Sequence, residues 1–275
     1  MSDRFAPLRA RIKDAAGRVL FGAADRVLPE RYTRYSGPAR HVRETLLRHR
    51  VGAVVDVGAN TGGYRDFLRR RCGYRGLVVS FEPVPELAAA LRRRAAADPL
   101  WVVMECALGA EDGSRAINVM RNSVFNSFLA PGGAAARHFD HNVVERVERV
   151  EVRRLDTLMR DLSARHGIGD FYLKMDTQGF DLEVLKGAEA VLDRVPALQT
   201  EISVQPIYQG MPDWREAVAR LEALGFGLSA LFAISRDPVG RVVEFDCFAV
   251  NAARAGTAAP PATDQPMTEG SRGVA

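Results

Sequence analysis

Acidic side chains stand where several short apolar segments of this sequence end. Asp56 lies in VVDVGANTGG (54–63), Glu82 ends SFE, and Asp176 ends LKMD. Lys174 precedes Asp176 by two positions, so the two side chains share one face if this segment is a strand. A carboxylate beside a lysine can accept a proton from a hydroxyl group. We therefore take Asp176 as the candidate base and Lys174 as the group that orients it or favours its ionised form.

Two of these acidic residues also have simpler explanations. Asp176 can instead cap the helix predicted after it, which is a common position for Asp. Glu201 stands near the end of the mostly apolar segment ALQTEIS (197–203), where it could contact hydroxyl groups of an acceptor or the base. Its alternative is a buried ion pair with Lys174. The candidate catalytic residues are Asp176, Lys174 and Glu201.

The glycines after Asp56 predict a tight turn from a buried strand into a helix. A dinucleotide-binding turn reads G-x-G-x-x-G, and its middle glycine lets the backbone approach a pyrophosphate. Here the three positions are Gly58, Asn60 and Gly63. Glu82 follows Gly63 by 19 positions, where a carboxylate can accept hydrogen bonds from both hydroxyls of a ribose. The pattern favours an adenosine-type ligand without a pyrophosphate, although glycines at such a turn can also serve packing alone.

S-adenosylmethionine has these chemical features. Its ribose can bind Glu82, its amino-acid end can bind the backbone of the glycine turn, and its adenine can lie near the CALG segment (106–109). The candidate cofactor-binding residues are Asp56, Gly58, Ala59, Asn60, Gly62, Glu82, Cys106 and Ala107.

Segments with strand and helix patterns alternate along most of the chain. Strands are predicted at 51–58, 76–82, 100–107, 171–176, 197–203, 227–232 and 241–250, and helices at 64–72, 85–97, 181–192 and 214–225. This alternation predicts an α/β fold with a seven-stranded, mostly parallel sheet and helices on both faces. The last two strands are close enough in sequence to pair antiparallel. Ligands of such sheets bind at the carboxyl ends of the strands.

The chain is predicted to have one main domain with two extensions. Residues 1–50 read as a helical extension, 51–251 as the ligand-binding domain, and 252–275 as a disordered tail. The alternation is interrupted at about 111–169 by an insertion with two strands and a helix. Asn126 and Ser127 lie in this insertion and could bind the acceptor, although turn formation explains them equally well.

Composition excludes several classes of protein. The chain has 275 residues, 47% hydrophobic and 26% charged, with a net charge of +4. No apolar run is long enough to span a bilayer, and the start of the chain lacks a signal-peptide pattern. We therefore expect a cytoplasmic protein without stable membrane insertion. The weak charge and few aromatic residues argue against nucleic acid as a partner.

No metal site is predicted from the sequence. The three cysteines lack the spacing of metal ligands. His138 and His141 flank Asp140 and could supply a base or, with Asp176 and Glu201, hold a divalent metal. Two histidines at this spacing in a loop are more often surface residues.

Several segments together resemble the FkbM family of S-adenosylmethionine-dependent methyltransferases. They occur in family order over residues 51 to about 250 and read VVDVGANTGG, SFEPVPE, CALG, NSFL, LDTL, LKMDTQGFDLEVLKGAEAVL and LQTEIS. The resemblance implies a class I methyltransferase fold and methyl transfer to a hydroxyl of a sugar, glycolipid or polyketide-type acceptor. The family commonly has D-x-E-G-x-E, whereas this chain has Gln178 and Asp181 at the two glutamate positions.

Two functions of other classes compete with a methyltransferase. A nicotinamide-dependent, sugar-modifying oxidoreductase is disfavoured by Asn60 in the glycine turn and by the lack of a Tyr-x-x-x-Lys pair. A non-catalytic scaffold that binds the cofactor is conceivable because of Gln178. The sequence predicts a small-molecule or glycan acceptor and does not indicate its identity or the oligomeric state.

Overall fold

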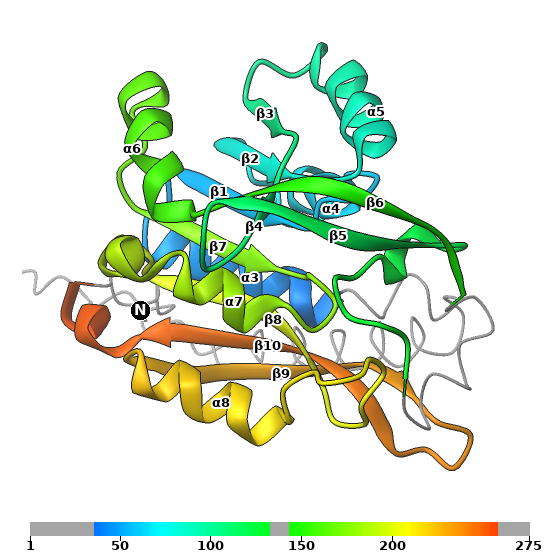
Figure 1. The fold of residues 1–275 in the computed structure, drawn as a ribbon. Helices are drawn as coiled ribbons and strands as arrows, with labels where there is room; N and C mark the ends of the chain where they lie inside the picture. Colours follow the sequence, from blue (N-terminus) through cyan, green and yellow to red (C-terminus); the bar gives the residue numbers. More distant parts are fainter. Residues whose placement is uncertain (1–35, 133–142, 258–275) are drawn as a thin grey trace, which may run out of the picture.

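The computed structural model describes residues 36–132 and 143–257 (Figure 1). Within these residues, seven strands form one sheet in the order β3-β2-β1-β7-β8-β10-β9. The pairs from β3 to β8 are parallel, and β10 is antiparallel to both β8 and β9. The bounds are β1 (Ala53–Val57), β2 (Leu77–Phe81), β3 (Trp101–Met104), β7 (Phe171–Met175), β8 (Ala197–Ser203), β9 (Phe226–Arg236) and β10 (Val242–Asn251). The predicted α/β sheet is confirmed.

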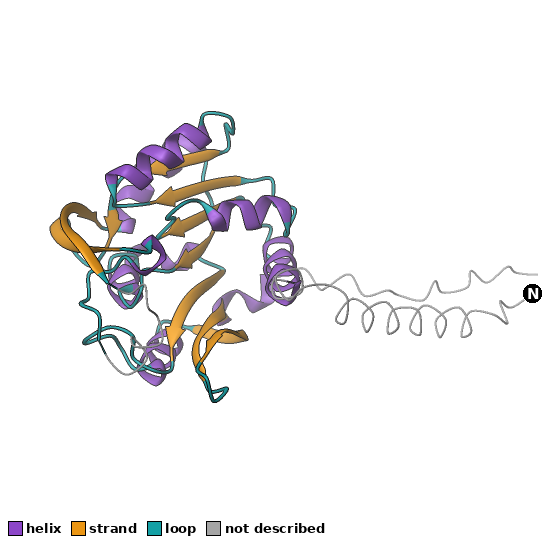
Figure 2. Ribbon diagram, turned by 90° about the vertical axis from the view of Figure 1, so that its right-hand side faces the viewer, coloured by secondary structure: helices purple, strands orange, loops and turns teal. Residues whose placement is uncertain are grey.

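Helices cover both faces of this sheet (Figure 2). On one face, Val54 and Tyr172 pack with α3, α4 and α5. On the other face, Val55 and Leu173 pack with α6, α7, η3 and α8. Neighbouring strand positions thus point to opposite layers, as the two-residue period of a strand requires. The bounds are α3 (Ser36–Arg48), α4 (Gly63–Arg70), α5 (Pro85–Ala95), α6 (Leu155–His166), α7 (Asp181–Lys186), η3 (Glu189–Arg194) and α8 (Trp214–Ala223).

The strand order reverses between β1 and β7. The chain proceeds from β1 to β2 and β3 on one side, and it returns to pair β7 on the other side of β1. Such a reversal leaves a crevice at the carboxyl ends of the two central strands. The register places Asp56 of β1 directly beside Lys174 of β7. Charged residues of the predicted site therefore meet at this crevice.

The strand predicted at 100–107 is divided between two sheets. β3 ends at Met104, whereas β4 (Ala107–Leu108) pairs in parallel with β6 (Val144–Arg153). β6 also pairs antiparallel with β5 (Gly113–Met120), which completes a three-stranded sheet (Figure 1, green). The chain thus leaves the main sheet after Met104 and joins a second sheet, whose central strand β6 comes from a later segment. The two strands predicted in the insertion belong to this second sheet.

The helix predicted at 181–192 is also divided. α7 ends at Lys186, and the chain continues through Gly187 into the 3-10 helix η3. The carbonyl of Gly187 accepts a hydrogen bond from the backbone of Asp156 at 3.0 Å instead of a helical one. An ideal Cβ on Gly187 would lie 1.9 Å from the carbonyl oxygen of Gly109. The two backbones approach too closely here for any side chain.

The predicted domain bounds remain a prediction. α3 falls in the predicted helical extension, whose residues 1–35 lie outside the described ones. Residues 252–257, assigned from the sequence to a disordered tail, form the 3-10 helix η4, and 258–275 lie outside the described residues. α6, placed in the insertion, packs into the main core. Among the helices described, none combines the length and apolar character that a bilayer crossing needs.

Replacing Gly187 tests the close approach of α7 to Gly109. We expect Gly187→Ala to lower the free energy of unfolding by about 1–3 kcal/mol, because the new methyl group overpacks this contact. Chemical denaturation of the purified protein measures the change. Gly52→Ala is the matched control, because no atom lies within 4 Å of its ideal Cβ. Equal effects of the two substitutions would contradict the packing argument.

Candidate active site

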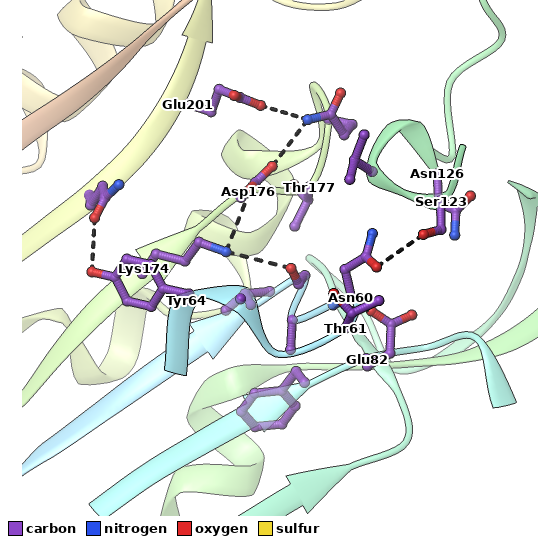
Figure 3. Close-up of a pocket in the computed structure, with 18 of the residues that line it drawn as sticks. Asn60, Thr61, Tyr64, Glu82, Ser123, Asn126, Lys174, Asp176, Thr177 and Glu201 are labelled. Carbon is purple, nitrogen blue, oxygen red and sulfur yellow. Dashed lines mark hydrogen bonds and ion pairs between the residues drawn. The ribbon is translucent and has the colours of Figure 1, made fainter. Parts of the chain in front are cut away.

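A cavity of about 700 Å³ opens at the carboxyl ends of β1, β7 and β8 (Figure 3). Pro38 of α3 and Tyr64 of α4 line it on one face of the sheet. Phe81 and Leu108, which pack into the core of the other face, also belong to its lining. The 3-10 helix η1 (Ser123–Phe125) and the loop after it contribute another wall. Most of the predicted site residues line this cavity, namely Gly58, Ala59, Asn60, Glu82, Ala107, Asn126, Ser127, Lys174, Asp176 and Glu201.

The glycine turn is held by its neighbours on both sides. The backbone N–H groups of Gly58 and Ala59 donate to the carbonyl of Phe81 at 3.1 and 3.0 Å. Gly58 has φ +77°, and an ideal Cβ on it would lie 2.0 Å from the carbonyl oxygen of Asp176. Glycine is therefore required here both for its backbone conformation and for the close approach of the loop after β7. Asn60 is also left-handed, with φ +48°.

Glu82 joins the end of β2 to the glycine turn. Its Oε2 accepts a hydrogen bond from the backbone of Asn60 at 2.7 Å, and its Oε1 accepts one from Val84 at 2.9 Å. Burial raises the pKa of Glu82 to about 7, because the two backbone hydrogen bonds offset only part of the desolvation of the charge. Each carboxylate oxygen can accept a further hydrogen bond. Glu82 can thus hold the turn and a diol together.

Asp56 and Lys174 form a buried ion pair behind the cavity wall. Oδ1 of Asp56 lies 3.1 Å from Nζ of Lys174, and Oδ2 accepts a hydrogen bond from Ser80 at 3.1 Å. Burial opposes the charge of Lys174, but Asp56 and Asp176 outweigh it and raise the pKa of this lysine. Asp56 is fully buried and is not part of the cavity lining. It contacts the site through its ion pair with Lys174, and its predicted role in cofactor binding remains a prediction.

Asp176 lies between a cation and an amide at the entrance to the loop after β7. Its Oδ2 is 3.6 Å from Nζ of Lys174, and its Oδ1 accepts a hydrogen bond from Gln178 at 3.1 Å (Figure 3). The side chain is 40% exposed, so a hydroxyl group can reach it. The alternative of a helix cap is not observed, because α7 has Phe180 as its N-cap residue and no side-chain cap. Asp181 instead accepts from the backbone of Thr177 at 2.9 Å.

Glu201 lies beside Asp176 in the inner part of the cavity. Its Oε2 accepts a hydrogen bond from Nε2 of Gln178 at 2.6 Å. Burial, followed by the charges of Asp176, Glu244 and Asp246, raises the pKa of Glu201 well above its ordinary value. The alternative of an ion pair with Lys174 is not observed, since that lysine pairs with Asp56 and Asp176.

Of the two residues predicted near the adenine, Cys106 and Ala107, only Ala107 lines the cavity. Cys106 packs into the main core, and burial raises the pKa of its thiol to about 12. Ala107 does line the cavity, together with Ile117 and Phe128 from the second sheet and the loop after it. Gly62, the remaining cofactor candidate, precedes α4 with φ +84° and does not line the cavity.

Asn126 and Ser127 line the cavity, but their side chains also hold its wall together. Oδ1 of Asn126 accepts a hydrogen bond from the backbone of Met120 at 2.8 Å. Oγ of Ser127 donates to the carbonyl of Gln178 at 2.8 Å and accepts from the backbone of Leu129 at 3.0 Å. The loop that carries them is thereby fastened to the loop after β7. Their predicted role in acceptor binding remains a prediction.

Sequence reasoning missed a chain of hydrogen bonds at the inner end of the cavity. Tyr64 donates through its hydroxyl to Oε1 of Gln199 at 2.8 Å, and Nε2 of Gln199 donates to Asp246 at 2.9 Å. Gln199 precedes Glu201 by two positions, so the period of the strand could have placed it on the same face. Asp246 faces Glu201 across the β8–β10 ladder, which requires knowledge of the antiparallel register.

The histidines considered as metal ligands, His138 and His141, lie outside the described residues, as does Asp140. In the part of the chain that the structure describes, no three histidine, cysteine or acidic side chains are grouped so that they could hold a metal ion.

Comparison with known proteins identifies one family. The methyltransferase FkbM domain matches residues 56–228, which is more than half of the chain. The matched range contains the glycine turn, Glu82 and the residues from Lys174 to Glu201. No match is found among curated proteins.

Solved structures of methyltransferases are similar to the chain at low identity. A methyltransferase FkbM from Methylobacillus flagellatus is 18% identical, over 74% of this chain and 47% of that one, with a TM-score of 0.44. Fibrillarin from Aeropyrum pernix, with natively bound S-adenosyl-L-methionine, is 12% identical over 72% and 66%, with a TM-score of 0.42. Magnesium protoporphyrin IX methyltransferase from Synechocystis is 9% identical over 80% of each chain, also at 0.42. The chain spans about half the length of the Methylobacillus protein.

Removing Lys174 tests the buried ion pair. We expect Lys174→Met to lower the free energy of unfolding by about 3–5 kcal/mol, because Asp56 is left as a lone buried charge. Chemical denaturation at neutral pH measures this loss. The double variant Asp56→Leu/Lys174→Met should recover part of it, since no lone charge remains.

Lys186→Met is the matched control for this experiment. Lys186 pairs with Glu183 at the surface, where its side chain is 51% exposed. Its removal should cost less than about 1 kcal/mol. A loss for Lys174→Met that is no larger than the control's would contradict the role of the pair.

Proposed function

The chain belongs to the FkbM methyltransferase family, and on this premise we propose that it transfers the methyl group of S-adenosylmethionine to a hydroxyl of a sugar, glycolipid or polyketide-type acceptor. Membership confirms the family predicted from the sequence, and S-adenosylmethionine is the cofactor of that family. It also sets aside the nicotinamide-dependent oxidoreductase. The acceptor and the residues that act on it are the proposed part.

The cavity has groups that fit the cofactor. Glu82 offers two carboxylate oxygens to the hydroxyls of a ribose, beside the turn of Gly58 to Asn60. Ala107, Ile117 and Phe128 give an apolar wall that suits an adenine ring. The lack of a Cβ at Gly58 keeps the turn close to the loop of Asp176. When bound, S-adenosylmethionine supplies a methyl group that is already activated by its positively charged sulfur.

The observation that carries the proposal is the position of Asp176. Its carboxylate lines the cavity beside the glycine turn and is accessible to a hydroxyl group. Nζ of Lys174 lies 3.6 Å from Oδ2 of Asp176 and places a positive charge beside it. We propose that Asp176 accepts the proton of the acceptor hydroxyl, and that the cavity orients this hydroxyl and keeps water away from it. Glu201 lies beside the base and can hold a second hydroxyl.

The lining of the cavity supports an acceptor with both a polar and an apolar part. Gln199, Glu201 and Asp246 supply side-chain oxygens at the inner end, which suit the donor hydroxyls of a sugar or polyol. Phe232 and Ile234 of β9 line another part of the wall and are apolar. A glycolipid, a glycosylated metabolite or a polyketide has this combination of hydroxyl and apolar groups.

Cofactor binding can be tested without knowing the acceptor. We expect Glu82→Gln to weaken S-adenosylmethionine binding by about tenfold or more, because a charged acceptor of two hydrogen bonds is lost. For the unmodified protein, we expect binding to weaken about tenfold between about pH 8 and about pH 6, since protonation of Glu82 as the pH falls below its raised pKa removes the charged acceptor. Isothermal titration with S-adenosylmethionine measures both effects.

The matched control for Glu82 is Glu111→Gln, an exposed glutamate that is not part of the cavity lining. The affinity of Glu111→Gln for S-adenosylmethionine should equal that of the unmodified protein. Binding that is indifferent to Glu82 would disprove the proposed ribose contact, whereas binding of NADH alone would disprove the cofactor.

Catalysis by Asp176 can be tested with labelled S-adenosylmethionine and a panel of methyl glycosides and hydroxylated macrolides. We expect Asp176→Asn to reduce kcat by about a hundredfold to ten-thousandfold, with little change in cofactor affinity, because a general base is lost. Scintillation counting of the methylated product measures the rate. Asp161→Asn, at an exposed position on α6, is the control with unchanged rate. Cofactor binding without transfer to any acceptor would instead support the scaffold alternative.

A further inference from the structure

Gln178 links the two acidic groups at the inner end of the cavity. Its Nε2 lies 3.1 Å from Oδ1 of Asp176 and 2.6 Å from Oε2 of Glu201. In Figure 3 the dashed lines from Asp176 and Glu201 meet at this one nitrogen. A primary amide has two N–H groups, so it can donate one to each carboxyl group. The bond to Glu201 reaches from the loop after β7 to the neighbouring strand β8.

A tyrosine contacts the other end of this amide. Oε1 of Gln178 accepts a hydrogen bond from the hydroxyl of Tyr208 at 2.8 Å, and this hydroxyl also lies 2.9 Å from the carbonyl of Phe125. Tyr208 is buried, and burial raises the pKa of its hydroxyl, which therefore keeps its proton. A flipped amide would direct its oxygen at two carboxyl groups, whereas the orientation described directs its N–H groups at them. The single O–H of Tyr208 is shared between Oε1 of Gln178 and the carbonyl of Phe125.

The backbone of Gln178 is held as firmly as its side chain. Its φ is +54°, a left-handed conformation that is unusual for a residue with a side chain. Its carbonyl accepts a hydrogen bond from Oγ of Ser127 at 2.8 Å. The loop from η1 and the tyrosine from the segment after β8 therefore both fix Gln178 between Asp176 and Glu201.

The charged groups around Asp176 and Glu201 come from several elements. Lys174 on β7 lies 3.6 Å from Asp176 and is shared with Asp56 on β1. Glu244 and Asp246 on β10 raise the pKa of Glu201, and Asp181 on α7 contributes a further acidic group near Asp176. Neighbouring hydroxyl groups include those of Thr177, which donates to Asp181, of Tyr208, and of Tyr64, whose ring lies against Nζ of Lys174. The acidic groups thus outnumber the one lysine among these neighbours.

We propose that Gln178 is a positioning residue, whose neutral amide bridges Asp176 and Glu201 and so allows two carboxyl groups to share the inner end of the cavity with Asp176 ionised as the base. The bridge itself is independent of the proposed function, whereas its part in catalysis rests on it. Glutamate at this position would place a third acid against the other two. Since an ionised carboxylate has no proton to donate, the cluster would have to bind an additional proton.

The first test measures the stability of the unliganded protein and needs no acceptor. The variant Gln178→Glu introduces an acid whose pKa is raised in the folded state by its two acidic neighbours and by burial. Such a group does not lower the free energy of unfolding at a pH below its pKa in the unfolded chain. The free energy of unfolding decreases as the pH rises above that value and through the pKa of the group in the folded protein. We expect the urea concentration at the unfolding midpoint of Gln178→Glu, relative to that of the unmodified protein, to decrease as the pH is raised from about 5 to about 8.

Gln205→Glu is the matched control for this measurement. Gln205 also donates through Nε2 to an aspartate, at 3.3 Å from Oδ2 of Asp237, but it is not part of the cavity lining. Its neighbour Asp237 is already paired with Arg241 at 2.7 Å. The control should therefore show a smaller dependence on pH. An equal dependence for the two variants would overturn the bridge.

The second test measures catalysis with an acceptor found among the glycosides and macrolides. Gln178→Met has a similar size, lacks the amide and adds no charge, so it remains informative if the glutamate variant folds poorly. We expect both variants to lower kcat by about tenfold or more while the affinity for S-adenosylmethionine is unchanged. In Gln178→Glu the acidic limb of the pH profile of kcat should shift upward by about one unit.

The two tests fail in distinguishable ways. If the unmodified protein transfers no methyl group, the proposed function is wrong, and the stability test still decides whether the bridge exists. If the unmodified protein is active and both variants keep its kcat and its pH profile, Gln178 has only a structural role and the positioning proposal is overturned.

Discussion

The site depends on one buried ion pair at the point where the strand order reverses. Asp56 and Lys174 are direct neighbours in the parallel register of β1 and β7, and the charge of Lys174 is shared with Asp176 at the end of β7. A charge as buried as Asp56 is tolerated only with such a partner. The same lysine therefore stabilises the central strands and holds the carboxylate that we propose as the base. In this site, stability and chemistry depend on one side chain.

The cofactor turn and the base are joined by backbone packing as well as by charge. Gly58 approaches the carbonyl of Asp176 so closely that no side chain fits between them. Glu82 extends this unit, since it accepts a hydrogen bond from Asn60 in the same turn. Three strand ends, those of β1, β2 and β7, thus form one connected structure. Glu82 and Asp176 consequently line the same cavity.

The sequence predicted the features that follow from strand periodicity and missed those that depend on a distant partner. Alternation predicted the sheet and brought Glu82, Asp176 and Glu201 to its carboxyl edge. It did not predict that the strand at 100–107 divides, because β4 pairs with β6 from a later segment. For the same reason the inward packing of Cys106 and the position of Asp246 were not predicted. These features are set by pairing and register between segments far apart in the chain, which a local pattern does not contain.

The neutral residue at position 178 follows from the distribution of charge. Lys174 already pairs with both Asp56 and Asp176. Its charge is therefore not available to Glu201, which lines the same cavity from β8. A neutral donor can accommodate Glu201 beside Asp176, whereas another acid would need a cation or a proton. Gln178, Lys174 and the two carboxyl groups form one electrostatic unit, because Lys174 pairs with Asp176 and Gln178 bridges Asp176 to Glu201.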